Sequence, residues 1–130
     1  MSSKSANYCF ASRESPVGVL MLSEVALGTQ YTRTSAEYEA DKSCRKAKAD
    51  STFGMGKTAP DATGDATDPD EPDVKVPMGV GGPSSSLKPG QASSLLYNEF
   101  IVYDVAQIKT RYVLQVPGLT SYLPTCLSSY

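Results

Sequence analysis

At 130 residues, with 40% hydrophobic and 20% charged residues, the chain falls in the range of one ordinary globular domain, outside the disordered and fibrous classes. A formal net charge of -2 provides no basic field that would neutralise the phosphates of a nucleic-acid duplex. The chain has no histidine, which excludes Ser-His-Asp triads, Cys-His pairs and histidine-ligated metal sites made from this chain alone.

Cysteine usage and hydropathy set further limits. The three cysteines are odd in number and form no C-x-x-C pair, so we expect a reducing compartment rather than a disulfide framework or a zinc site. The longest nearly apolar stretch, residues 17–27, is far shorter than the ~20 residues that span a bilayer, so no transmembrane helix is expected. The polar residues after Met1 lack the apolar core of a secretory signal, which favours the cytosol or nucleus.

The first part of the chain is expected to form a short helix and then a strong strand. Residues 2–9 are polar, and Ser2 or Ser3 could cap one or two helical turns. Residues 17–27 are a continuous apolar run between a proline and a glycine, which predicts a strand buried on both faces near the centre of a sheet. Residues 31–39 alternate weakly and fit a short edge strand or a turn of helix.

A cluster of basic residues follows. It consists of Lys42, Arg45, Lys46 and Lys48. A solvated loop is the favoured interpretation, and a nuclear-import signal or a patch that contacts phosphate is the alternative.

Residues 58–94 are expected to be mostly loop. Prolines and glycines are frequent there, and acidic residues are concentrated between residues 61 and 73. One short strand is predicted at residues 73–76, where it stops before a proline. Irregular segments beyond ~12 to 15 residues are uncommon in compact domains and are usually functional or disordered, so residues 61–72 are the expected place for disorder.

Two strands are predicted near the end of the chain. Residues 95–105 and 111–116 are rich in β-branched and aromatic side chains with partial two-residue alternation. A turn around Ala106 and Gln107 would join them, and an antiparallel pair is the simplest connection.

Glu99 is the carboxylate of most interest in these strands. Alternation places it on one strand face with Ile101 and Tyr103, so that it lies beside apolar neighbours. A solvent-facing carboxylate at a strand end is the commoner case, and a buried functional carboxylate is the alternative. Periodicity does not decide between the two.

One short motif suggests phosphate binding but fits the rule poorly. Gly56, Lys57 and Thr58 match the end of G-x-x-x-x-G-K-[ST], yet Ser51 stands where the first glycine is required. A glycine-rich turn is therefore expected, and a P-loop nucleotide hydrolase is a remote alternative.

Five blocks of the sequence carry a resemblance to a known family. They are KSANYC (4–9), PVGVLMLSEVALG (16–28), GMGKTAPD (54–61), VKVPMG (74–79) and LLYNEFIVYDVAQ (95–107). In content and order they closely resemble the C-terminal half of the poly(ADP-ribose) polymerase catalytic domain. The resemblance implies an α+β fold, namely the mainly antiparallel β-sheet half of an ADP-ribosyltransferase domain, with a short N-terminal helix and a long irregular loop. It assigns residues 1–116 to a partial catalytic domain and residues 117–130 to a divergent tail.

The resemblance also implies an activity. Such enzymes break the bond between nicotinamide and ribose in NAD and pass ADP-ribose to a protein side chain or a growing polymer. NAD is then a substrate, and neither a cofactor nor a metal is expected. Glu99 matches the family's catalytic glutamate, whose presence favours polymer formation. Lys4 matches a lysine that borders the donor and acceptor sites, Ser5 a serine that hydrogen-bonds the carboxamide, and Tyr8 a tyrosine that stacks on nicotinamide.

Two family features have no counterpart in this chain. One is a histidine followed by glycine, and the other is a tyrosine in a Tyr-Phe-Ala-Asp-Met stretch whose methionine corresponds to Met1. We therefore expect a truncated gene model or partial product, inactive alone and active within a longer chain. The alternative is a short, non-catalytic interaction module that keeps the partial fold. An open frame encoding Tyr-Phe-Ala-Asp before Met1 would favour the first, and a stop codon there the second.

The resemblance also sets expectations about partners and location. The expected partners are NAD and acceptor proteins or ADP-ribose chains, with no membrane. DNA would be contacted only through domains that this chain does not contain. The expected location is the nucleus, with the cytoplasm as the alternative.

Overall fold

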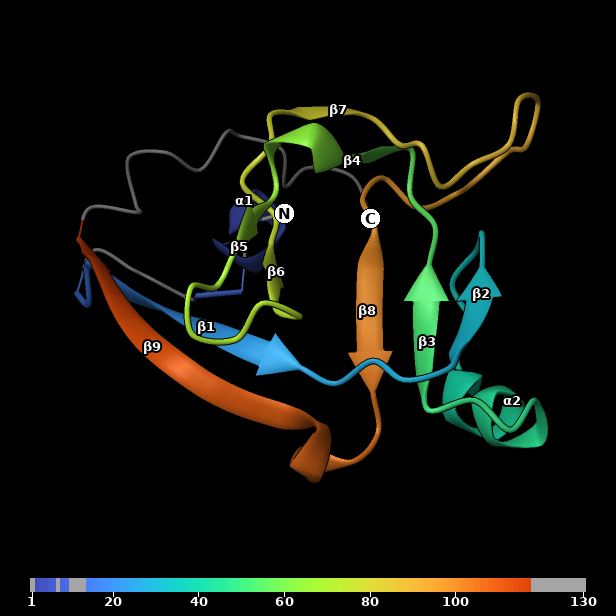
Figure 1. The fold of residues 1–130 in the computed structure, drawn as a ribbon, viewed down its shortest axis with the longest axis horizontal. Coiled ribbons are helices and arrows are strands. Elements are labelled where there is room, and N and C mark those ends of the chain that lie inside the picture. Colours follow the sequence, from blue (N-terminus) through green and yellow to red (C-terminus); the bar gives the residue numbers. More distant parts are fainter. Residues whose placement is uncertain (1, 7, 10–13, 118–130) are drawn as a thin grey trace. The chain divides into compact units, whose positions relative to one another are not determined.

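The computed structural model describes residues 2–6, 8, 9 and 14–117 (Figure 1). Its sheets are mostly antiparallel and its helices few and short, which confirms the α+β prediction. The helices are α1 (Ser2–Ala6), α2 (Ala40–Lys46) and the 3-10 turns η1 (Ala62–Gly64) and η2 (Val105–Gln107). The strands are β1 (Val17–Val25), β2 (Gln30–Arg33), β3 (Ser51–Gly54), β4 (Thr58–Pro60), β5 (Ala66–Thr67), β6 (Lys75–Val76), β7 (Gly81–Pro83), β8 (Glu99–Val102) and β9 (Ile108–Pro117).

The chain divides into two compact units. The first unit spans residues 25–108, and the second holds residues 2–24 together with the residues after 108. Each unit has its own strand pairing, so each is described by itself below.

A three-stranded sheet organises the first unit, in the order β2-β3-β8. Strand β2 runs parallel to β3 at the edge of this sheet. Of the two alternatives for residues 31–39, the edge strand is confirmed as far as Arg33, and residues 34–39 are not strand. Strand β8 pairs with β3 in the antiparallel sense, so that Thr52 lies opposite Ile101 and Gly54 opposite Glu99. The side chains of Ser51 and Thr52 are almost fully buried in β3. The best-buried part of the described chain therefore surrounds the strand that neighbours Glu99.

Helix α2 covers part of β3 and replaces the loop that the basic cluster predicts. Lys42 pairs with Glu39 and Arg45 with Asp41, at spacings of three and four residues that a helix brings together. Cys44 faces inward at 1% exposure. The basic side chains are exposed, as expected, but the loop prediction is wrong because these pairs and an inward-facing thiol favour a helical turn.

The segment between β4 and β8 is mostly loop, as predicted, and contains two short antiparallel pairs, β4–β7 and β5–β6. Strand β6 lies within the strand predicted at residues 73–76. Residues 61–72 were the expected place for disorder, and the structure instead gives them defined turns. The Asp61 carboxylate accepts from the backbone N–H of Thr63 at 2.9 Å, and Asp68 accepts from the N–H groups of Asp70 and Glu71. Aspartates followed by such turns satisfy their own backbone locally.

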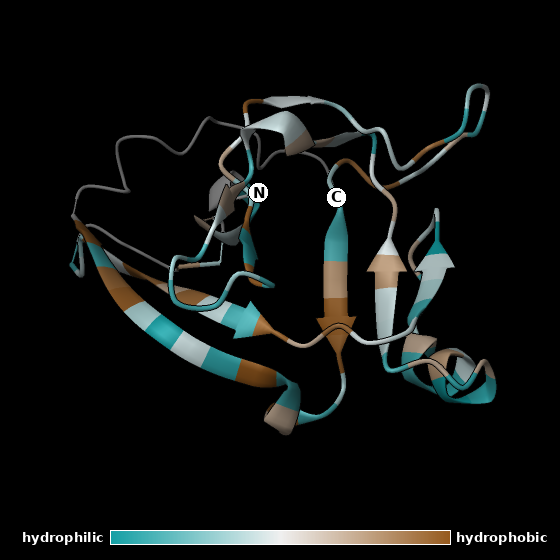
Figure 2. Ribbon diagram, viewed as in Figure 1, coloured by the Kyte–Doolittle hydropathy of each residue, from teal (hydrophilic) through white to brown (hydrophobic). Residues whose placement is uncertain are grey.

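The second unit is built on a two-stranded ribbon of β1 and β9, and it overturns one prediction. Residues 17–27 were expected to be buried on both faces at the centre of a sheet, but among the described residues β1 has β9 as its strand neighbour. Met21 is 71% exposed and Val113 67%. Figure 2 shows apolar positions along both strands of this ribbon. Among the described residues no third strand joins this ribbon, and two strands by themselves bury little apolar surface.

The two last strands do not pair with each other, contrary to the antiparallel pair expected. Strand β8 joins β3, and β9 joins β1. Between them, the Asp104 side chain accepts from the Ala106 N–H, and the Gln107 side chain accepts from the Asp104 N–H, which completes a capping box around η2. This capped turn redirects the chain, so a hairpin does not form.

No described helix has both the length and the apolar character needed to cross a membrane.

Candidate active site

Glu99 is the first residue of β8 and is half-buried, lying opposite Gly54 of β3. The next residue, Phe100, stacks on Phe53 with ring centroids 4.7 Å apart and an angle of 3° between the rings. Just after the end of β8, the Tyr103 hydroxyl lies 2.7 Å from the buried Thr52 hydroxyl. Because side chains alternate along a strand, these contacts hold β8 on both sides of its pleat and fix the face on which Glu99 projects.

The glycine-rich segment before β4 packs directly against the start of β8. A Cβ atom built on Gly56 would lie 2.0 Å from the carbonyl carbon of Tyr97 and 2.5 Å from the nitrogen of Asn98. Only a residue without a Cβ lets the two backbones approach this closely.

The same segment does not have the backbone arrangement of a P-loop. Residues 55–57 form an irregular link between β3 and β4 rather than the glycine-rich turn expected from the sequence. Its backbone N–H groups already donate to the protein: Lys57 to the Leu95 carbonyl at 3.0 Å and Thr58 to the Leu96 carbonyl at 2.9 Å. The Gly56 N–H donates to the Asn98 side-chain oxygen at 2.8 Å. A phosphate cradle needs such N–H groups to point at the ligand.

The other three residues that the resemblance assigns to the site lie in the second unit. Lys4 and Ser5 belong to the five-residue helix α1, where Lys4 is half-buried and Ser5 exposed. The Tyr8 N–H donates to the Ser5 carbonyl at 3.0 Å, so the serine and the tyrosine, three residues apart, lie at the two ends of one turn. The Tyr8 ring is 66% exposed. The structure therefore brings Lys4, Ser5 and Tyr8 together and places Glu99 in the other unit.

Helix α1 is also tied to its neighbouring strand through Cys9. The Cys9 thiol donates to the Val19 carbonyl at 3.3 Å and lies 3.8 Å from the Ser5 carbonyl. This contact orients the turn that carries Ser5 and Tyr8 relative to β1.

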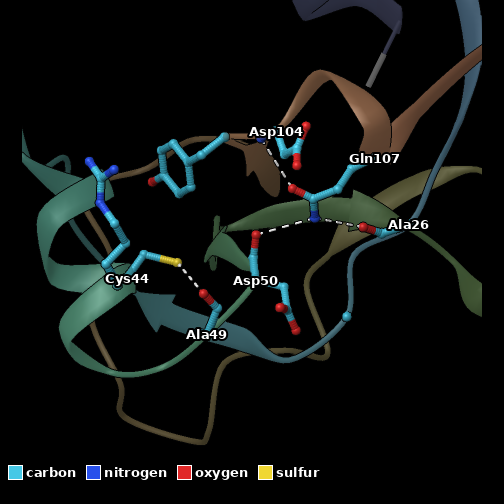
Figure 3. Close-up of a pocket in the computed structure, with 9 residues that line it drawn as sticks. Ala26, Cys44, Ala49, Asp50, Asp104 and Gln107 are labelled. Atoms are coloured by element: carbon cyan, nitrogen blue, oxygen red, sulfur yellow. Dashed lines mark hydrogen bonds between the residues drawn. The ribbon is translucent and has the colours of Figure 1, made fainter.

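A separate hollow of about 490 Å³ lies in the first unit, and Glu99 does not line it (Figure 3). At its rim the Gln107 side-chain amide donates to the carbonyl oxygens of Ala26, at 2.8 Å, and Asp50, at 3.2 Å. The Cys44 thiol on another wall donates to the Ala49 carbonyl at 3.2 Å. These polar groups join segments of the fold to one another.

The Asp61 carboxyl in the connecting loop has a lowered pKa. The Thr63 backbone N–H, and to a smaller degree the Thr63 hydroxyl, stabilise the ionised form of Asp61 and so lower the pKa of that carboxyl. Asp61 is fully exposed, so water screens the effect. Within residues 2–6, 8, 9 and 14–117, no three of the His, Cys, Asp and Glu side chains gather as a metal site would require.

Sequence reasoning missed one residue next to Glu99. Asn98 accepts from Gly56 and contacts two serines of the preceding loop, but a lone asparagine at a strand end carries no recognisable pattern. Gly56 was noticed for its likeness to a phosphate-binding loop, whereas its structural role is close packing against residues 97 and 98.

Comparison with known proteins identifies the family. A family model described as the poly(ADP-ribose) polymerase catalytic domain matches residues 1–117. The chain is 44% identical over 122 residues to a poly [ADP-ribose] polymerase of Drosophila melanogaster, with 94% of this chain and 11% of that protein covered. It is 47% identical over 116 residues to poly [ADP-ribose] polymerase 2-A of Oryza sativa subsp. japonica, covering 89% of this chain and 16% of that protein.

A third relative has a similar identity and coverage. Poly [ADP-ribose] polymerase 1 of Gallus gallus is 44% identical over 116 residues, which covers 89% of this chain and 10% of that protein. The chain thus spans between 10% and 16% of the length of these relatives. From the match over residues 1–117 and these identities, the chain belongs to the poly(ADP-ribose) polymerase catalytic-domain family.

Proposed function

We propose that this chain forms the part of an NAD-dependent ADP-ribosyltransferase that carries the catalytic carboxylate. The reaction passes ADP-ribose from NAD to protein side chains or to a growing polymer, with NAD as substrate and no cofactor. The observation that carries the proposal is the family match over residues 1–117, which includes a half-buried Glu99 held at the start of β8. The relatives' names support the same chemistry.

In this proposal Glu99 stabilises charge that develops on the ribose. As nicotinamide leaves, positive charge spreads over the sugar ring, as in the cleavage of glycosides. A carboxylate hydrogen-bonded to the ribose hydroxyls lowers the energy of that state, and it can also polarise an attacking acceptor hydroxyl. The pairing of β8 with β3 and the stacked Phe53 and Phe100 rings provide the rigid support that such a group needs.

Lys4, Ser5 and Tyr8 are proposed to bind the other parts of NAD. A phenol ring with an open face suits offset stacking on nicotinamide, and Tyr8 is 66% exposed. The Ser5 hydroxyl would pair with the carboxamide, which loses ~1 to 3 kcal/mol if it enters a dry pocket without partners. Lys4 would border the donor and acceptor sites.

Residues 1–130 alone are proposed to be inactive. The chain contains no histidine to hold the adenosine ribose. The exposed apolar side chains of the β1–β9 ribbon also indicate that further polypeptide covers them in the active protein. We propose acceptor proteins or ADP-ribose chains as partners, DNA contacts only through other domains, and a nuclear location.

A chimera tests the activity directly. Residues 1–117 would replace the matching segment of the Drosophila melanogaster polymerase, and polymer formation and NAD hydrolysis would be measured with radiolabelled NAD. Glu99→Gln keeps the size of the side chain but removes its charge, so polymer formation should fall by about a hundredfold or more while some NAD hydrolysis survives. Glu14→Gln, which alters an exposed carboxylate, is the matched control and should leave both rates unchanged.

Three results with the chimera or with residues 1–130 would contradict parts of the proposal. Unchanged polymer length in Glu99→Gln would remove Glu99 from its proposed role. A folded chimera without any turnover of NAD would instead favour the non-catalytic interaction module. Turnover by residues 1–130 alone at the rate of the chimera would show that the proposed inactivity is wrong.

Tyr8 can be tested with nicotinamide-mimicking inhibitors. Tyr8→Ala removes the stacking surface, so inhibitor affinity should fall by about 1 kcal/mol or more, which is about fivefold or more in Kd. Tyr38→Ala is the matched control, because that ring is fully exposed on the first unit. Calorimetric titration of the chimera measures both, and an unchanged affinity in Tyr8→Ala would place the ring outside the nicotinamide site.

A further inference from the structure

The Asn98 side chain joins three separate points of the first unit. Its Oδ1 accepts from the Gly56 N–H at 2.8 Å and from the Ser84 hydroxyl at 3.3 Å, and its Nδ2 donates to the Ser86 hydroxyl at 3.4 Å. We call these four residues, Asn98, Gly56, Ser84 and Ser86, the Asn98 junction. An amide suits this place because it accepts and donates from one planar group.

The backbone around the Asn98 junction is held as tightly as the side chain. The Asn98 N–H donates to the Thr58 carbonyl at 3.2 Å, and the Ser84 N–H donates to the Lys57 carbonyl at 2.9 Å. Gly56 approaches the Tyr97 carbonyl so closely that a Cβ atom would lie 2.3 Å from its oxygen. The backbone that enters β8 therefore contacts the glycine segment, and the glycine segment is in turn bonded to the serine loop.

Asn98 immediately precedes Glu99, so contacts that hold Asn98 also affect the direction of the Glu99 side chain. Neighbouring strand residues share a peptide plane and project to opposite faces, so a rotation at one residue redirects the side chain of the next. Contacts of β8 with β3 begin at Glu99 itself, opposite Gly54, so the sheet register holds the glutamate only from its own position onward. The Asn98 junction provides the support on the other side of Glu99.

We propose that Asn98 is a positioning residue that fixes the orientation of Glu99 through Gly56, Ser84 and Ser86. The proposal rests on the catalytic role proposed for Glu99. A supporting residue that keeps a reacting group within about 0.5 Å of its productive geometry affects the rate although it does not touch the substrate. Ser84 and Ser86 also connect the loop before β8 to the same amide, so the orientation of Glu99 and the path of that loop are set together.

The first experiment measures the junction without any activity. Amide hydrogen exchange, followed by NMR on residues 1–130, should show protection at Gly56 that falls about tenfold or more in Asn98→Leu, because the N–H loses its acceptor. Asn98→Asp keeps an acceptor for Gly56 and Ser84 and should retain most of the protection. Gln91→Leu is the matched control, since it removes a side-chain amide of the same loop that accepts from the nearby Lys88 N–H at 3.1 Å and does not contact Gly56. Unchanged exchange at Gly56 in Asn98→Leu would overturn the proposal.

The second experiment measures, in the chimera, the ratio of polymer formed to NAD hydrolysed. A merely destabilised protein loses polymer formation and NAD hydrolysis in equal proportion, whereas a misdirected Glu99 reduces polymer formation more strongly. We expect the ratio of polymer to hydrolysed NAD to fall about tenfold in Asn98→Leu, to recover in large part in Asn98→Asp and to be unchanged in Gln91→Leu.

The outcomes separate the two proposals. If Glu99→Gln reduces polymer formation and Asn98→Leu leaves the ratio unchanged, Glu99 keeps its role and Asn98 has no positioning function. If Glu99→Gln has no effect, the proposed function fails, and with it the positioning role. A lower ratio in Asn98→Leu, restored in Asn98→Asp, supports both.

Discussion

The three-stranded sheet of the first unit and the β1–β9 ribbon of the second differ in how burial relates to residue type. In the sheet, Ser51 and Thr52 are polar yet almost fully buried, and each hydroxyl has a partner: Ser51 donates to the Leu27 carbonyl at 2.7 Å, and Thr52 lies 2.7 Å from the Tyr103 hydroxyl. In the ribbon, Met21 and Val113 are apolar yet mostly exposed. Residue type therefore does not decide burial in this chain, and the presence of neighbouring layers does.

The comparison also shows where stability and function are expected to reside. Polar contacts and close backbone approaches hold the sheet that carries Glu99, so changes there should be costly. Across the ribbon Ser23 contacts Thr110, and Glu24 pairs with Arg111 and Lys109. Changes there should be nearly neutral for folding.

The largest effect is expected where the glycine segment meets β8. Gly56→Ala places a methyl group within 2.0 Å of the Tyr97 backbone, which cannot move without disturbing the start of β8. We expect the free energy of unfolding to fall by about 2 to 3 kcal/mol. Gly82→Ala is the control, because its added Cβ would have no atom within 4 Å. Urea unfolding measures both, and equal stability of the two variants would contradict the close approach.

A pair of serine variants compares the two regions directly. Ser51→Ala leaves the Leu27 carbonyl without its buried donor and should lower the free energy of unfolding by about 1 to 2 kcal/mol. Ser23→Ala removes a hydroxyl contact of 3.3 Å in the ribbon and should change it by less than about 0.5 kcal/mol. Thermal unfolding of both variants provides the test. A larger cost for Ser23 would reverse the comparison.

The smallest effect concerns Asp61 in the connecting loop. Because the pKa of this carboxyl is lowered in the folded chain, its contribution to stability is present above the ordinary aspartate pKa and is lost as the pH falls through the lowered value. NMR titration should show the Asp61 carboxyl and the Thr63 amide changing together at a pH below the usual range for aspartate. In Asp61→Asn the Thr63 amide should lose this transition, and persistence of the transition would assign it to another group.

Local pattern predicts the strands of this fold well and their partners poorly. The apolar run of β1 and the alternation of β8 were visible in the sequence, but the register of β8 against β3 depends on residues far away along the chain. The predicted pairing of the last two strands failed because the capping box of Asp104 and Gln107 turns the chain away. Helix α2 was missed because its stabilising pairs looked like an unstructured basic cluster.

The residues of the candidate site also fall into those that the sequence indicates and those that only the structure reveals. Lys4, Ser5, Tyr8 and Glu99 came from family resemblance, since periodicity alone left Glu99 undecided between a solvent-facing and a functional carboxylate. Asn98 could not be found from the sequence, because its contact with Gly56 spans 42 positions. The sequence draws attention to Gly56 only through its likeness to a phosphate-binding loop. Its structural role, close packing against residues 97 and 98, is visible only in three dimensions.

The pairing of β3 with β8 has a kinetic consequence. Ser51 lies opposite Val102, so this pairing must close a long stretch of chain before it gains any contact energy, whereas β2 and β3 are closer in sequence. Non-local pairings of this kind slow folding. Newly synthesised chains would therefore form the sheet that holds Glu99 late in folding. Species that lack this sheet expose unpaired strand edges and are prone to aggregate, so a folding assistant should increase the yield of native protein.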